Sequence, residues 1–95
     1  MITFNELLER TKTKNIAVHT PTEDEAKALL AKLHKRSYAW NSGTKLTIET
    51  FYKNYEEKTA YAFERRHKIA YCSLDWYQEN DYTIVEFSDI DFQEE

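Results

Sequence analysis

The densest basic run in the sequence, Arg65-Arg66-His67-Lys68, lies between two segments in which aromatic and small residues alternate. That alternation, over residues 60–64 and 68–72, predicts two β-strands joined at a hairpin tip. A guanidinium presents a planar pair of donors to phosphate, and aromatic rings present faces on which bases stack. The run therefore predicts a nucleotide-binding surface, with Arg65, Arg66, Lys68 and Tyr61 as candidate residues. The simpler interpretation, a solvated tip above core aromatics, stays open.

A second candidate half-site follows a short strand expected at residues 38–40. Trp40 offers an aromatic face, Ser42 offers a hydroxyl, and the turn around Gly43 offers main-chain amides. Gly43 is the only glycine of the chain, and we expect it to adopt a positive φ in this turn. Trp40 and Ser42 therefore join the candidate ligand-binding residues, although Ser42 before a glycine is also ordinary turn chemistry.

The C-terminal part of the chain is strongly acidic. Residues 75–95 carry eight Asp or Glu and no Lys or Arg, so the remainder holds nine acids against thirteen bases. An acidic C-terminal segment repels duplex nucleic acid and favours binding to a basic protein partner. Asp89, Asp91 and Tyr77 are the candidate partner-binding residues, since tyrosine is enriched at binding hot spots. The alternative is an acidic tail, residues 89–95, that serves solubility.

Several classes of function lack the residues they need. The three histidines, His19, His34 and His67, are not spaced as metal ligands, and Cys72 is the only cysteine. No nucleophile elbow occurs, and a lone cysteine in an alternating strand is usually a small core residue. We therefore expect neither an enzyme nor a cofactor nor a metal.

The location of the protein is also an expectation from composition. No stretch without Asp, Glu, Lys or Arg is longer than residues 15–22, which is too short to cross a bilayer. The early acids Glu6 and Glu9 do not suit a signal peptide. The lone Cys72 fits a reducing compartment. We expect a cytoplasmic protein that does not bind a membrane.

The elements expected around these residues make one α+β domain over residues 1–95. Thr3 and Glu6 form a capping-box pattern for an N-terminal helix within residues 1–14. The strongest signal is a helix over 21–35, which we expect Thr20 to cap with Pro21 in its first turn. Other expected helices are a turn beginning at Thr47 and the segment 74–79 capped by Ser73, and further strands are expected at 16–19 and 82–87. The prediction is a small, mostly antiparallel sheet packed on one main helix, with extra short helices.

Residues 15–88 resemble a family of small, largely uncharacterised phage and prophage domains. The resemblance rests on the T-P-T-E-D-E-A-K-A-L-L segment at 20–30, the Y-A-W-N-S-G segment at 38–43 and the Y-T-I-V-E-F segment at 82–87. Small phage proteins of this type often antagonise host defence by binding, so the resemblance implies a non-enzymatic, host-cell role. The ligand would be a nucleotide immune signal that is sequestered or, as the alternative, a host defence protein that is inhibited through the acidic end. A homo-oligomer would give the surplus aromatic residues a use.

Overall fold

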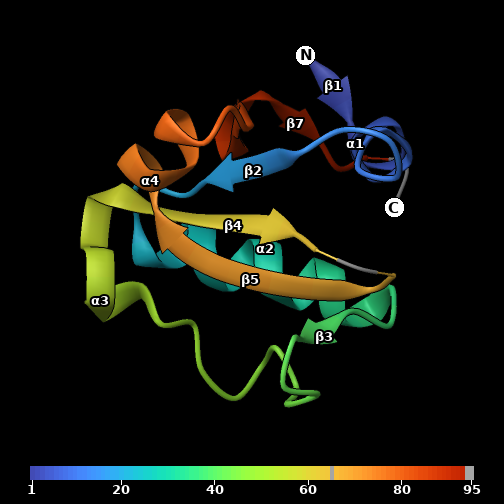
Figure 1. Ribbon diagram of the computed structural model, residues 1–95. Coiled ribbons are helices and arrows are strands. Elements are labelled where there is room, and N and C mark those ends of the chain that lie inside the picture. The colour runs from blue at the N-terminus through green and yellow to red at the C-terminus, as the bar shows by residue number, and fades with distance from the viewer. Residues whose placement is uncertain (65, 94–95) are drawn as a thin grey trace.

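The computed structural model describes residues 1–64 and 66–93 of the chain. The helices and strands follow one another as β1 (Ile2–Thr3), α1 (Phe4–Arg10), β2 (Ile16–His19), α2 (Glu23–Lys35), β3 (Ala39–Trp40), α3 (Tyr52–Tyr55), η1 (Glu56–Lys58), β4 (Thr59–Phe63), β5 (Lys68–Ser73), α4 (Leu74–Glu79), β6 (Thr83–Glu86), η2 (Phe87–Asp89) and β7 (Ile90–Asp91). The predicted α+β class is confirmed, and Figure 1 shows α2 lying behind the strands.

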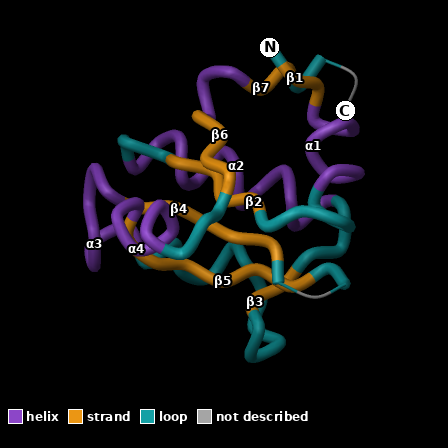
Figure 2. Tube along the Cα trace, turned by 45° about the horizontal axis from the view of Figure 1, so that its top comes forward, coloured by secondary structure: helices purple, strands orange, loops and turns teal. Residues whose placement is uncertain are grey.

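A five-stranded sheet in the order β3-β5-β4-β2-β6 forms the centre of the molecule. Its two inner pairings, β5 with β4 and β4 with β2, are antiparallel, and the first of them is the hairpin predicted from the alternating pattern. Its two outer pairings, β3 with β5 and β2 with β6, are parallel, so the sheet is mixed. The parallel pairings join segments far apart in the sequence, which local patterns do not reveal. Figure 2 shows the strands side by side, with α1 and the short helices around them.

Helix α2 covers one face of this sheet with Ala26, Leu29, Leu30 and Leu33, all buried. The predicted cap was wrong by two residues, because Thr22 rather than Thr20 accepts the hydrogen bond from the helix, through Glu25 N–H at 3.2 Å. Thr20 is instead buried, and its amide donates to the Thr59 carbonyl at 3.0 Å. Both threonines precede a glutamate by three positions, so the sequence pattern fits either one. Continuation of the β2–β4 pairing through Thr20 decides between them.

The other face of the sheet is lined by alanines, and this corrects the expected role of Tyr77. Ala17 and Ala62 are partners across β2 and β4, and with Ala60 they form a buried cluster around Tyr77 of α4. Tyr77 is 2 % exposed, so it is a core residue and not a partner-binding residue. Small side chains on the strands leave space that the tyrosine ring fills, and burial raises the pKa of its hydroxyl. The neighbouring Trp76 is the exposed aromatic residue of this helix.

The two chain ends meet beside the main sheet. Strands β1 and β7 pair in parallel, and Ile90 of β7 is buried. The Phe92 ring packs on the Phe4 ring of α1 with centroids 5.0 Å apart. The segment predicted as an acidic tail therefore belongs to the fold as far as residue 93, and Glu94 and Glu95 lie outside the described residues. The N-terminal helix follows the sequence closely, since Thr3 and Glu6 complete the predicted capping box.

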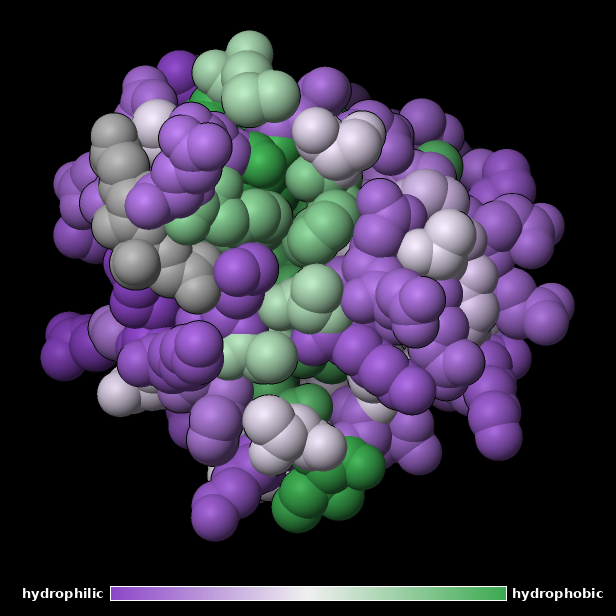
Figure 3. Space-filling model, turned by 180° about the vertical axis from the view of Figure 1, so that it is seen from behind, coloured by the Kyte–Doolittle hydropathy of each residue, from purple (hydrophilic) through white to green (hydrophobic). Residues whose placement is uncertain are grey.

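The connection between β3 and β4 departs most from the sequence pattern. The helix expected from Thr47 is a single turn, Tyr52–Tyr55, preceded by Phe51 with φ of 59°. Leu46 anchors the preceding loop by complete burial, while Ile48 is 69 % exposed. Seen from behind, the molecule is mostly hydrophilic, with apolar residues that run from the top of the view through its centre to a strongly hydrophobic group at the lower edge (Figure 3).

Replacement of Tyr77 tests the packing on the alanine face. Tyr77→Ala should lower the free energy of unfolding by about 3–5 kcal/mol, because it removes a buried ring and leaves a cavity. Gln78→Ala, an exposed position on the same helix, is the control and should change it by no more than about 0.5 kcal/mol. Urea unfolding followed by circular dichroism measures both, and equal losses would contradict this account of the second core.

Candidate functional site

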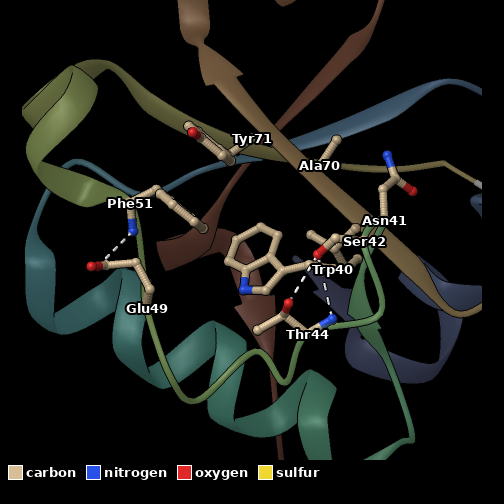
Figure 4. Close-up of a pocket in the computed structure, with 9 residues that line it drawn as sticks. Trp40, Asn41, Ser42, Thr44, Glu49, Phe51, Ala70 and Tyr71 are labelled. Carbon is tan, nitrogen blue, oxygen red and sulfur yellow. Dashed lines mark hydrogen bonds between the residues drawn. The ribbon is translucent and has the colours of Figure 1, made fainter.

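A pocket of about 300 Å³ opens where β3 ends and the chain leaves the sheet. It is lined by Trp40, Asn41, Ser42, Thr44, Glu49, Phe51, Ile69, Ala70 and Tyr71. Three segments build it: the end of β3 with its turn, the loop before α3, and the middle of β5. Figure 4 shows the Trp40 ring between Phe51 on one side and the turn of Asn41 and Ser42 on the other, with Tyr71 across from it.

Three aromatic rings form the wall of this pocket. The rings of Phe51 and Tyr71 are stacked with centroids 4.3 Å apart and planes 2° apart. The Trp40 ring meets them edge-on, at 5.1 Å from Phe51 and 5.8 Å from Tyr71. Asn54 Nδ2 donates to the Tyr71 hydroxyl at 3.2 Å, which ties the ring to α3. Such edge-on and stacked contacts are favourable geometries for aromatic rings, so the wall is held in place without a ligand.

The polar rim of the pocket is organised by Glu49 and Ser42. Glu49 Oε1 accepts from the amides of Thr50 at 2.9 Å and Phe51 at 3.1 Å, which holds the loop as it enters the left-handed residue Phe51. Ser42 Oγ donates to Thr44 Oγ1 at 3.0 Å (Figure 4). Gly43 between them has φ of 92°, the positive φ predicted from the sequence.

Trp40 carries an unpaired donor at this pocket. The residue is 5 % exposed, and its Nε1 is buried with no hydrogen-bond partner in the described part of the chain. A buried donor without an acceptor costs about 1–3 kcal/mol. Such groups are rare in folded proteins, and this one lies in the residue at the centre of the pocket (Figure 4).

The predicted basic surface is separate from this pocket. Arg66 and His67 line a second hollow with Lys12, Glu64, Phe63, Thr11 and Tyr38. The Tyr38 ring stacks on the His67 ring at 4.6 Å, and His67 Nδ1 lies 3.1 Å from the Arg36 carbonyl. Arg65 lies outside the described residues. The structure therefore places Arg66 away from Trp40 and Ser42, which line the first pocket.

Two other candidate residues take different places from those expected. Lys68 is half-buried and pairs with Ala39, one position from the Trp40–Ile69 pair, so its side chain faces the other side of the sheet from Trp40. Tyr61 is fully buried in the central strand β4, and its hydroxyl donates to the Thr50 carbonyl. Burial raises the pKa of this hydroxyl. Tyr61 is thus a core residue beneath the pocket, where its ring centroid lies 5.9 Å from that of Trp40.

The acidic candidates lie at the opposite end of the molecule. Asp89 is exposed in η2 and shares a shallow hollow with Glu6, Glu86 and Arg10. Asp91 is half-buried in β7 and accepts from the Gln93 amide at 2.9 Å. Figures 1 and 2 both place β7 at the top and β3 at the bottom, so these acids do not border the aromatic pocket.

A histidine that sequence reasoning missed joins three elements. His19 Nδ1 lies 2.8 Å from Glu86 Oε1, and His19 Nε2 lies 2.7 Å from the Glu57 carbonyl oxygen. His19 is thereby a structural tie between β2, β6 and η1. No local pattern shows it, since its partners lie 38 and 67 positions away.

Within residues 1–64 and 66–93, no three His, Cys, Asp or Glu side chains are grouped so as to hold a metal ion. Over the same residues, no helix is long and apolar enough to cross a membrane.

Comparison with family models, curated proteins and solved structures finds no match to this chain. The resemblance to phage domains therefore stays a prediction.

Replacement of Glu49 tests how the pocket rim is held. Glu49→Ala removes the acceptor of two loop amides and should cost about 1 kcal/mol of stability, with faster hydrogen exchange at Thr50 and Phe51. Glu49→Gln keeps an oxygen at the same position and should retain most of the protection. Amide exchange followed by NMR measures both variants. Unchanged exchange in Glu49→Ala would show that the loop is held by the aromatic wall alone.

Proposed function

We propose that this chain is a non-enzymatic binding protein that takes a polypeptide partner at the pocket of Trp40, Phe51 and Tyr71. The observation that carries the proposal is an open, aromatic-walled pocket that is already formed at the edge of the sheet. Preformed apolar pockets with a few polar groups are the usual form of binding sites. An apolar side chain of a partner would fill it and cover the Trp40 ring.

The charges around the pocket favour a polypeptide over a nucleotide. None of the nine lining residues is Lys, Arg or His, and the one charged lining residue is Glu49. A carboxylate at the rim repels phosphate and favours a partner with a basic residue beside its apolar one.

The resemblance to small phage domains suggests which kind of protein the partner is. By that resemblance the partner is a host defence protein, and the chain acts as its inhibitor in the host cytoplasm. The exposed acids, Asp89 among them, would add long-range attraction to a basic partner and speed its approach without contributing to the pocket itself. The absence of catalytic activity belongs to the same proposal.

Filling the pocket should abolish partner binding. Thr44 is exposed at the rim, so Thr44→Trp places a ring in the pocket mouth with little cost to the fold. Thr47→Trp, exposed on the same loop but not lining this pocket, is the matched control. A displayed library of random linear peptides is selected for binding to the wild-type protein. The affinities of the selected peptides for the wild type and for both variants are then measured by calorimetry.

We expect the selected peptides to share one large apolar residue. Their affinity for Thr44→Trp should be lower than for the wild type by about tenfold or more, and their affinity for Thr47→Trp should equal that for the wild type. Failure to select any peptide, or equal affinity for both variants, would count against the proposed site.

A second candidate function rests on the Tyr38–His67 stack. Lys12 and Arg66 line the same hollow as this aromatic pair, so a phosphate could contact the two cations while a base contacts the rings. Calorimetry with mononucleotides and cyclic dinucleotides tests it. If the nucleotide hypothesis is right, Arg66→Ala should weaken binding about tenfold or more, while the pocket variant Thr44→Trp should bind normally. No heat of binding with any of these nucleotides would remove the sequestration role.

A further inference from the structure

We propose that the partner segment binds in an extended conformation and pairs with the main chain of Tyr71 at the open edge of β5, while one of its apolar side chains enters the pocket. This inference rests on the proposed function and specifies how the partner is held. It follows from the hydrogen-bond pattern of β5, which runs along one wall of the pocket.

The main chain of β5 bonds to its two neighbours at alternate residues. On the side of β3, Ala39 N–H donates to the His67 carbonyl at 3.0 Å and Asn41 N–H donates to the Ile69 carbonyl at 3.1 Å. On the side of β4, Glu64 N–H donates to the Lys68 carbonyl at 3.0 Å. Odd-numbered residues of β5 thus face β3, and by strand alternation the N–H and C=O of Tyr71 face the same way.

Strand β3 ends before it reaches Tyr71. Its last pairing is Trp40 with Ile69. The chain then turns away at Gly43, whose N–H donates to the Trp40 carbonyl at 2.7 Å. Within the described residues, no strand takes the next position along β5, so the ladder stops one step short of Tyr71.

In the part of the chain that the structure describes, no strand pairs with Tyr71 on this side of β5, and its main chain borders the pocket. Ala70 and Tyr71 both line it, as do Asn41 and Ser42, where β3 turns away. In Figure 4 the β5 ribbon passes above the Trp40 ring, with Ala70 and Tyr71 along it. The site therefore offers a donor and an acceptor at the sheet edge beside an apolar cavity.

An extended polypeptide is the partner whose chemistry fits this combination. Its carbonyl accepts from the Tyr71 amide, its N–H donates to the Tyr71 carbonyl, and an adjoining side chain enters the pocket. Strand addition at an open sheet edge uses main-chain bonds for affinity and a side-chain pocket for specificity. Because the open edge is short, the pocket residue carries the selectivity and the edge sets the direction in which the segment lies.

The peptides selected on the wild-type protein provide the test. Each main-chain nitrogen within a selected peptide is methylated in turn, which removes one donor and leaves the side chains in place. Exchange of the Tyr71 amide is followed by NMR with and without the unmodified peptide. The Tyr61 amide in the central strand is the internal control, because it is already buried within the sheet.

We expect one methylated position, next to the apolar anchor residue, to lose about tenfold or more in affinity. We also expect the peptide to slow exchange of the Tyr71 amide by about tenfold or more and leave the Tyr61 amide unchanged. If methylation is tolerated at every position and the Tyr71 amide is not protected, strand addition is overturned.

The failure of this inference can be separated from failure of the proposed function. If Thr44→Trp weakens peptide binding but the peptides do not slow exchange of the Tyr71 amide, the pocket is supported as the binding site and the strand pairing is overturned. A library that yields no peptide would overturn both. If the protein alone protects its Tyr71 amide as its concentration rises and sediments as a dimer, the edge belongs to a second copy of this chain, and the peptide proposal is wrong.

Discussion

The burial of β4 on both faces is the constraint on which the rest of the structure depends. All five of its residues are buried, and its large and small side chains alternate, with Tyr61 and Phe63 on one face and Ala60 and Ala62 on the other. The large face requires a helix with an apolar stripe, which α2 supplies. The alanine face is too flat to bury much area by itself, so it needs a ring from elsewhere, and Tyr77 of α4 supplies it.

This arrangement also explains why the candidate pocket lies at one edge of the sheet. Tyr61 fills the space beneath Trp40, and the pocket forms beside it, where Phe51 and Tyr71 are only partly buried. Trp40, Phe51 and Tyr71 come from three separate parts of the chain, and they contact one another because the β3–β5 pairing brings two of these parts together. The loop before α3 closes the wall through the stack of Phe51 on Tyr71.

The pocket lies outside both of the charged segments that stand out in the sequence, the basic run at 65–68 and the acidic segment 75–95. Arg66 and Lys12 line the hollow that contains Tyr38 and His67, whereas Glu86 and Asp89 line a hollow beside β1 and α1. Between them, the aromatic pocket carries only Glu49 as an ionisable acid. In the proposed function, this pocket would select its partner by shape and apolar contact, while the distant charges would act on approach and orientation.

The sequence by itself determined the features that depend on neighbours within a few residues. Thr3 with Glu6, Ser73 before α4, Gly43 in its turn and the alternation on both sides of 65–67 are set by local hydrogen bonds and sterics, so they could be read directly. Only the tertiary structure decided which aromatic residues are core and which form a site. Tyr61 and Tyr77 were candidate binding residues and are buried, whereas Phe51 and Tyr71 form the wall of the candidate pocket, which no local pattern indicates. The physical reason is that burial of a ring depends on what packs against it: α2 covers the face of β4 that carries Tyr61, and the alanines of β2 and β4 leave room for Tyr77. Both arrangements depend on contacts between distant parts of the chain.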